Sequence, residues 1–169
     1  MGVTFDFDLT EGQSRRVLMA DCELECSQIS DNLFVAGAGI ASDLETLQRN
    51  GITRIVNCCA DVVEDHFIHL PDFKYLSLNM VDGRMEDISW FLGDVIHFIA
   101  NAHKQGRKVL VHCERGVSRS CSFVIAYNMW ISGTFSIFVL TRALFPRCCF
   151  LPHVNPSVLF SAFRRHALE

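Results

Sequence analysis

The stretch KVLVHCERGVSRS, residues 108–120, constrains the fold of this chain more than any other part of its sequence. KVLVH has the short apolar pattern of a buried strand, and it leads directly into a loop rich in Gly, Ser and Arg. A strand that ends in a tight loop and opens a helix brings backbone N–H groups together with the positive end of the helix dipole. The sequence therefore predicts an anion-binding loop between a strand and a helix.

Strand and helix patterns alternate along the chain from Ile29 onward. The expected strands are LFVAG at 33–37, TRIVNCC at 53–59, YLSLNM at 75–80 and KVLVH at 108–112. The expected helices cover 42–51, 88–106 with Asp87 as N-cap, 119–131, 134–145 and 156–167 with Asn155 as N-cap. This alternation predicts an α/β fold with a central, mostly parallel twisted sheet flanked by helices.

The chain length favours one domain, because 169 residues with 50% hydrophobic side chains bury one sizeable core and not two. Residues 1–25 carry mixed charge and weak periodicity. We expect them to form an N-terminal arm or a peripheral strand, with residues 26–169 as the folded domain.

Charge and cysteine spacing exclude several classes of function. A net charge of −4 without a Lys/Arg cluster argues against nucleic acid or an anionic membrane as a partner. The eight cysteines do not form two CxxC pairs, and the N-terminus lacks a basic-then-apolar secretory signal. We therefore expect reduced thiols, no metal and no cofactor, in a protein of the cytoplasm, with the nucleus left open.

One segment has the length of a membrane span, since residues 121–140 contain 20 residues without a charge. Gly133 is a candidate helix stop, and Thr134 is a candidate N-cap for the next helix. Two packed helices are therefore expected here, and no span.

The loop that follows KVLVH combines an anion cradle with a nucleophile. Gly116 permits a tight turn, and Arg119 is placed to hold two phosphate oxygens at once. The same positive field would ionise the Cys113 thiol, so that it can attack phosphorus. The alternative, an ordinary core cysteine, would have to coincide with this whole pattern. The residues assigned to phosphate binding are Glu114, Arg115, Gly116, Val117, Ser118 and Arg119.

The motif His-Cys-x-x-Gly-x-Ser-Arg-Ser, at residues 112–120, resembles the signature of the dual-specificity phosphatases in the cysteine-dependent tyrosine phosphatase superfamily. The likeness extends to LFVAGAGIASDLETLQRNGITRIVNCC, to AYNM at 126–129 and to VNPSVLF near the C-terminus. It covers roughly Ile29 to Ala162 and is similar to the small, stand-alone atypical members of the family.

This resemblance implies a two-step hydrolysis of phosphorylated proteins. Cys113 would attack the phosphoryl group, and water would then hydrolyse the cysteinyl phosphate. Arg119 and the loop amides would stabilise the equatorial oxygens, while Ser120 would assist departure of the thiolate. His112 and Asn155 would support the site from behind, although plain packing accounts for His112 equally well.

The general acid of the family lies on a loop before the long helix, where Asp82 stands in NMVDGRMED. Asp87 competes with it, but an N-cap position would give Asp87 a structural role. Glu86 is a weaker candidate. Asp82 is therefore the preferred acid.

Two features depart from the family pattern. Asn128 stands where an apolar residue is usual, so its amide needs a partner or costs about 1–3 kcal/mol. The helix expected at 134–145 is unusually apolar, which predicts that it packs under a neighbour or mediates self-association.

Three functions remain open at this point. The first is a phosphatase for phosphotyrosine and phosphoserine/threonine in proteins. The second is a lipid, glycan or RNA phosphatase on the same scaffold, although Glu114 and Arg115 replace the loop lysines that lipid-directed relatives tend to carry. The third is a phosphopeptide-binding module, which would be expected to lose the nucleophile or the acid.

A second thiol near Cys113 suggests redox control. Cys58 and Cys59 end the strand at 53–59, which the resemblance places beside the strand that delivers Cys113. Because successive side chains on a strand alternate in direction, only one of the two should face the site. We favour Cys59, the residue closer to the loop, as the thiol that traps an oxidised Cys113.

Overall fold

The computed structural model describes residues 25–80 and 88–133 of the chain. Five strands form one sheet in the order β1-β2-β5-β3-β4. Their bounds are β1 Ser27–Ser30, β2 Leu33–Ala36, β3 Ile52–Asn57, β4 Lys74–Ser77 and β5 Lys108–His112. Strands β2, β5, β3 and β4 are parallel to one another, while β1 pairs antiparallel with β2. The prediction of a mostly parallel sheet is confirmed.

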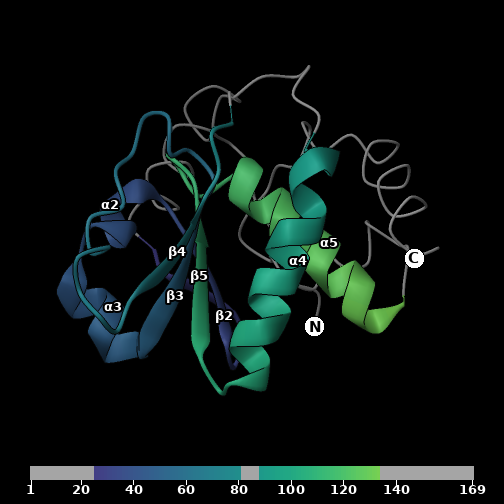
Figure 1. Ribbon diagram of the computed structural model, residues 1–169, viewed down its shortest axis with the longest axis horizontal. Helices are drawn as coiled ribbons and strands as arrows, with labels where there is room; N and C mark the ends of the chain where they lie inside the picture. Colours follow the sequence, from purple (N-terminus) through teal and green to yellow (C-terminus); the bar gives the residue numbers. More distant parts are fainter. Residues whose placement is uncertain (1–24, 81–87, 134–169) are drawn as a thin grey trace, which may run out of the picture.

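Helices cover both faces of this sheet (Figure 1). One side carries the short helices α2 and α3, and the other carries the longer helices α4 and α5. The bounds of these helices are α2 Ala38–Ala41, α3 Leu44–Asn50, α4 Ser89–Lys104 and α5 Arg119–Ser132. The result is a three-layer α/β arrangement with an apolar core on each face of the sheet.

Strand β5 is the centre of the sheet and belongs to both cores. Val109 and Val111 join the core under α4 and α5, while Leu110 joins the core under α3. This alternation follows from the two-residue period of a strand, and burial on both faces explains why KVLVH is apolar without interruption. The end of β5 is fixed on both sides, because Ala36 of β2 and Asn57 of β3 both lie opposite His112.

Local sequence signals set the ends of several helices. The Asp43 carboxylate accepts hydrogen bonds from the backbone N–H groups of Glu45 and Thr46, as expected of an N-cap. Gly51 ends α3 in the left-handed conformation, with φ of 70°. Gly133 ends α5 in the same way, with φ of 63°, so the predicted helix stop is confirmed.

Several predicted boundaries were wrong. Strand β1 was not predicted, because its residues SQIS are mostly polar and alternate between half-buried and exposed at the edge of the sheet. The helix expected at 42–51 is confirmed as α3, but the short helix α2 that precedes it was not predicted; Ser42 is the C-cap of α2. Helix α4 has Ile88 at its N-cap position and not Asp87, which lies outside the described residues.

Asn128 has the partner that its position demands. Its Nδ2 donates to the carbonyl of Val124 at 2.8 Å, one turn earlier in α5. The half-buried amide is therefore satisfied within its own helix.

The helices expected at 134–145 and 156–167, and the arm expected at 1–25 apart from its last residue, lie outside the described residues. Self-association through 134–145 and a domain boundary after residue 25 therefore stay predictions. Across residues 25–80 and 88–133, no helix combines the length and the apolar character that crossing a membrane requires.

Candidate active site

The predicted anion loop lies at the carboxyl end of β5, between that strand and α5 (Figure 1). Cys113 follows β5 directly, and its side chain is buried. Arg119 is the first residue of α5. Ligand sites in parallel sheets occur at this edge, because the loops that leave neighbouring strands meet there.

Three backbone carbonyls of the loop accept hydrogen bonds from residues outside it, which lie on α2 and α5. The backbone N–H of Ala38 donates to the Glu114 carbonyl at 3.0 Å, and the Cys121 thiol donates to the Gly116 carbonyl at 3.2 Å. The Ser118 carbonyl accepts from both the backbone N–H and the hydroxyl of Ser122, each at 3.0 Å.

These outer contacts determine where the loop amides point. In a trans peptide the N–H of one residue is directed away from the carbonyl of the residue before it. Carbonyls held from outside at Glu114, Gly116 and Ser118 therefore direct the next N–H groups toward the inside of the loop. Convergent N–H groups at the start of a helix form an anion cradle.

Gly116 allows the loop to approach β2 closely. Its φ is 73°, and a Cβ at this position would lie 2.6 Å from the Ala36 carbonyl carbon and 2.7 Å from the Gly37 nitrogen. Both atoms belong to the backbone, so they cannot move aside as a flexible side chain would. No other residue fits this position without displacing the loop.

The Cys113 sulfur and the Ser120 hydroxyl oxygen are 3.3 Å apart, and both side chains are buried. Either atom can be the donor of this hydrogen bond. When the sulfur carries a negative charge, the hydroxyl donates to it. The arrangement therefore places a donor beside the thiol, as the sequence predicted for Ser120.

The Arg119 side chain is buried and contacts both the loop and the segment that follows β4. Its Nη1 donates to the Met80 carbonyl at 3.0 Å, and its Nη2 lies 3.7 Å from the Glu114 carboxylate. The Met80 carbonyl is thus held by the Arg119 guanidinium.

His112 is held neutral beside this site. Burial lowers the pKa of its imidazole to about 4, so the ring carries no charge at neutral pH. Its Nδ1 is buried and has no hydrogen-bond partner within the part of the chain that the structure describes. The role of His112 in supporting the loop stays a prediction.

Cys58 and Cys59 both lie in the same buried cluster as Cys113. The Cys58 N–H donates to the His112 carbonyl at 2.9 Å, which extends the hydrogen bonding of the β3 segment with β5 past Asn57 to Cys58. Burial raises the pKa of the Cys59 thiol to about 12 and that of Cys58 well above its usual value. Both thiols are therefore protonated at neutral pH.

Asn57 fixes the turn that contains these two cysteines, a role that the sequence analysis missed. Its side-chain oxygen accepts from the Cys59 N–H at 3.0 Å and from the Cys59 thiol at 3.5 Å. Its Nδ2 donates to the Val63 carbonyl and to the Asp65 carboxylate. The sequence feature that could have indicated this role is a polar residue at the end of an apolar strand.

Cys121 was also missed, because a cysteine on an apolar helix carries no sign of its acceptor in the sequence. Other predicted site residues, Asp82, Glu86, Asp87 and Asn155, lie outside the described residues. The N-cap at Ile88 removes the structural reason for preferring Asp82 over Asp87, so the choice between them rests on the resemblance alone.

A sequence model described as "Dual specificity phosphatase, catalytic domain" matches residues 33–136, which include the whole loop. The chain belongs to the dual specificity phosphatase family. Protein-tyrosine-phosphatase MKP1 of Arabidopsis thaliana is 40% identical over 126 residues, 75% of this chain and 16% of that protein. The human serine/threonine/tyrosine-interacting protein is 39% identical over 115 residues, 64% of this chain and 51% of that protein.

Solved structures of this family have the same fold. The human tyrosine phosphatase-like serine/threonine/tyrosine-interacting protein matches with a TM-score of 0.71 and 30% identity, over 85% of this chain and 96% of that one. DUSP15 matches with a TM-score of 0.70 and 25% identity, over 83% of this chain and 88% of that one.

The chain spans from about a sixth to about half the length of the two curated relatives described above. Within residues 25–80 and 88–133, no group of three or more His, Cys, Asp or Glu side chains is arranged to hold a metal ion.

The close approach of Gly116 to β2 makes a testable prediction for the phosphatase loop. Gly116→Ala should weaken binding of inorganic phosphate by more than about 10-fold, because the new methyl group would displace the loop from the backbone of Ala36 and Gly37. Isothermal titration calorimetry measures this affinity.

Gly106→Ala is the matched control. Gly106 also has a positive φ, 65°, but nothing lies within 4 Å of its Cβ position. This variant should lose about 1 kcal/mol of stability and keep its phosphate affinity. Equal effects of the two variants on phosphate binding would contradict the argument from close approach.

Proposed function

We propose that this protein hydrolyses phosphotyrosine and phosphoserine/threonine in other proteins through a cysteinyl-phosphate intermediate. The observation that carries this proposal is the contact between the Cys113 sulfur and the Ser120 hydroxyl, 3.3 Å apart inside an anion loop. Membership of the dual specificity phosphatase family supports the same chemistry. Phosphorylated proteins are the proposed partners, and this chemistry calls for no metal or cofactor.

In the first step Cys113 forms a bond from sulfur to phosphorus while the bond to the leaving oxygen breaks. That oxygen must gain a proton, for which Asp82 is the proposed donor. Arg119 and the inward loop amides would carry the negative charge of the equatorial oxygens. Burial of Arg119 supports this role, because a fixed guanidinium needs little reorganisation during the reaction.

In the second step water attacks phosphorus and the bond from sulfur breaks. The departing sulfur takes the electron pair and becomes a thiolate. The Ser120 hydroxyl stands where it can donate a hydrogen bond to that charge. Proton transfer from water to the acid, now a carboxylate, completes the cycle and restores both residues.

A second candidate is a phosphopeptide-binding module. The human relative that shares the fold is described as tyrosine phosphatase-like and as an interacting protein, which makes a binding role worth testing here. The retained Cys113 and its contact with Ser120 favour catalysis over binding alone. Lipid, glycan or RNA phosphates are less favoured substrates. The expected location, the cytoplasm with the nucleus left open, also stays a proposal.

The covalent mechanism predicts separable roles for Cys113 and Arg119. Cys113→Ser should abolish turnover of an aryl phosphate and keep phosphate binding, because the amides and Arg119 remain. Arg119→Ala should lose both, and Arg119→Lys should keep the charge but lose the bidentate contact. If Cys113→Ser turned over substrate at the rate of the unsubstituted protein, the covalent mechanism would be ruled out. If the unsubstituted protein bound phosphopeptide without turnover, the binding module would be favoured.

The general acid can be identified by measuring how each variant changes the dependence of turnover on the leaving group. Asp82→Ala should lower turnover by about 100-fold or more for basic leaving groups and much less for acidic ones, since only a basic oxygen needs protonation. Asp87→Asn is the matched comparison and should leave this dependence unchanged. A dependence that changes with Asp87 and not with Asp82 would reverse the assignment.

Redox control by Cys59 is a further part of the proposal. A peroxide would oxidise the Cys113 thiolate to a sulfenic acid, releasing hydroxide, and a second thiol would then form a disulfide and release water. Cys58 is the alternative partner, since its backbone contact with His112 brings it beside Cys113, whereas the Cys59 thiol is bound to Asn57.

Peroxide treatment followed by mass spectrometry tests this control. A Cys113–Cys59 crosslink whose reduction restores activity is expected, and it should form faster as the pH rises, because burial keeps the Cys59 thiol protonated at neutral pH. Cys59→Ser should prevent recovery, with Cys58→Ser as the matched control. Recovery lost in Cys58→Ser and retained in Cys59→Ser would transfer the role to Cys58.

A further inference from the structure

The Glu114 side chain holds an unusual place in the loop, because it is an acid at the opening of an anion site. Its backbone is fixed, since the Glu114 carbonyl accepts from the Ala38 N–H at 3.0 Å. Its side chain is 56% exposed, and its Oε2 lies 3.7 Å from Nη2 of Arg119, whose own side chain is 6% exposed. A solvent-facing carboxylate thus approaches the buried guanidinium that the loop offers to phosphate.

The two terminal nitrogens of the Arg119 guanidinium face different groups. Nη1 already donates to the Met80 carbonyl at 3.0 Å, which holds one side of the guanidinium against the end of the β4 segment. Nη2 faces Glu114. A phosphate that binds Arg119 through two oxygens needs this same planar fork.

We propose that Glu114 is a specificity-determining residue: its carboxylate competes with the phosphate dianion for Arg119 and lowers the affinity of the site for phosphate. The inference rests on the proposed function in taking phosphate as the anion of the loop. Like charges repel most when the bound anion carries two charges, so free phosphate dianion is disfavoured more than a singly charged oxyanion. For the proposed enzyme, this favours release of the phosphate product.

The expected effect is modest because Glu114 is exposed and the ion pair is long. Exposed pairs contribute little, which corresponds to a change in affinity of about 1.5- to 5-fold. The sign of the change separates two roles of Glu114. A competitor weakens phosphate binding in the unsubstituted protein, whereas a residue that merely orients Arg119 would strengthen it.

The experiment is calorimetric titration of the reduced full chain with inorganic phosphate at mildly alkaline pH, where the dianion predominates. Glu114→Gln should bind phosphate about 1.5- to 5-fold more tightly than the unsubstituted chain. Glu114→Ala should do the same, so the result does not depend on how Gln packs. The constant for product inhibition by phosphate should fall by the same factor.

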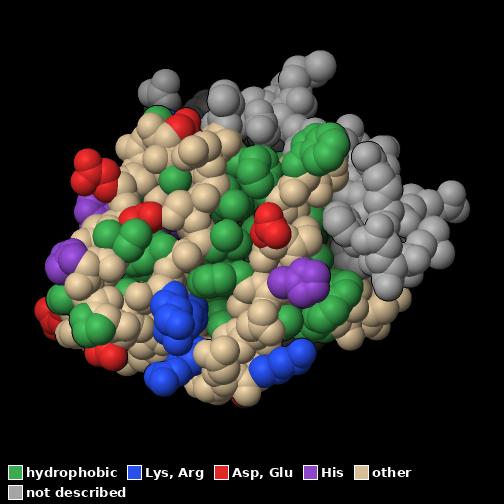
Figure 2. All heavy atoms as spheres, viewed as in Figure 1, with side chains coloured by type: hydrophobic (Ala, Val, Ile, Leu, Met, Phe, Trp, Pro, Cys, Tyr) green, Lys and Arg blue, Asp and Glu red, His purple; other side chains and the backbone are tan. Residues whose placement is uncertain are grey.

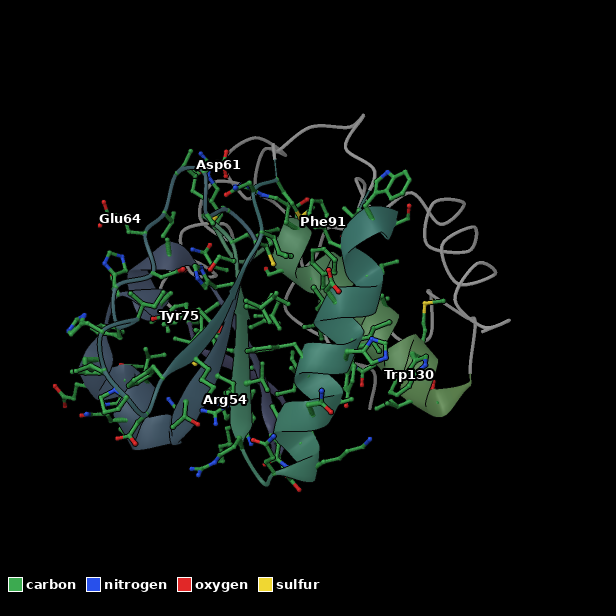
Figure 3. All side chains as sticks on the ribbon, in the orientation of Figure 1. Arg54, Asp61, Glu64, Tyr75, Phe91 and Trp130 are labelled. Atoms are coloured by element: carbon green, nitrogen blue, oxygen red, sulfur yellow. The ribbon has the colours of Figure 1, made fainter. Side chains whose placement is uncertain are left out.

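Glu64→Gln is the matched control, with the same chemical change at another exposed acid. Glu64 lies on the segment after β3 and points outward (Figure 3), so this variant should leave phosphate affinity unchanged. Unchanged or weaker binding in Glu114→Gln would overturn the inference, as would equal tightening in Glu64→Gln. Binding is measured without turnover, so an inactive chain with tighter binding in Glu114→Gln would contradict the proposed function and support this inference.

Discussion

The site depends on the close packing of the loop after β5 against the end of β2. Gly116 lies against the backbone of Ala36 and Gly37, and the next residue of that segment, Ala38, donates to the Glu114 carbonyl. Parallel pairing of β2 with β5 brings these segments together at one edge of the sheet. The loop can therefore direct its amides inward only after the central strands have paired.

The electrostatics of the site are local. On the face shown in Figure 2, lysine and arginine side chains gather along the lower edge, while the loop lies at the opposite, carboxyl edge of the strands. Near Cys113, burial keeps His112 neutral and the thiols of Cys58 and Cys59 protonated. The buried Arg119 guanidinium lies 3.7 Å from the carboxylate of Glu114. Because the attraction comes from one guanidinium and the loop amides, a single exposed carboxylate is able to modify it.

Much of the fold follows from local patterns in the sequence. The four parallel strands were predicted from apolar runs, because strands buried on both faces need apolar side chains. The end of α5 was predicted from Gly133, because a left-handed backbone favours glycine. Strand β1 has no such sequence pattern, since a polar edge strand is defined by its pairing with β2 and not by its own residues. The hydrogen bonds of Asn57 and Cys121 could not be predicted from the sequence either, because the tertiary fold of the turn and the loop determines which acceptors lie nearby.

The sequence by itself determined the family of the chain and led to the chemistry proposed for its loop, because the spacing of Cys113, Gly116 and Arg119 is local and specific. The tertiary structure decided which groups surround that loop. The register of β3 with β5 places the Cys58 backbone beside His112, and the turn held by Asn57 binds the Cys59 thiol. The contact of Glu114 with Arg119 likewise arises only once the loop has closed onto α5. Such contacts depend on the distance between segments and on strand register, neither of which a local pattern of residues encodes.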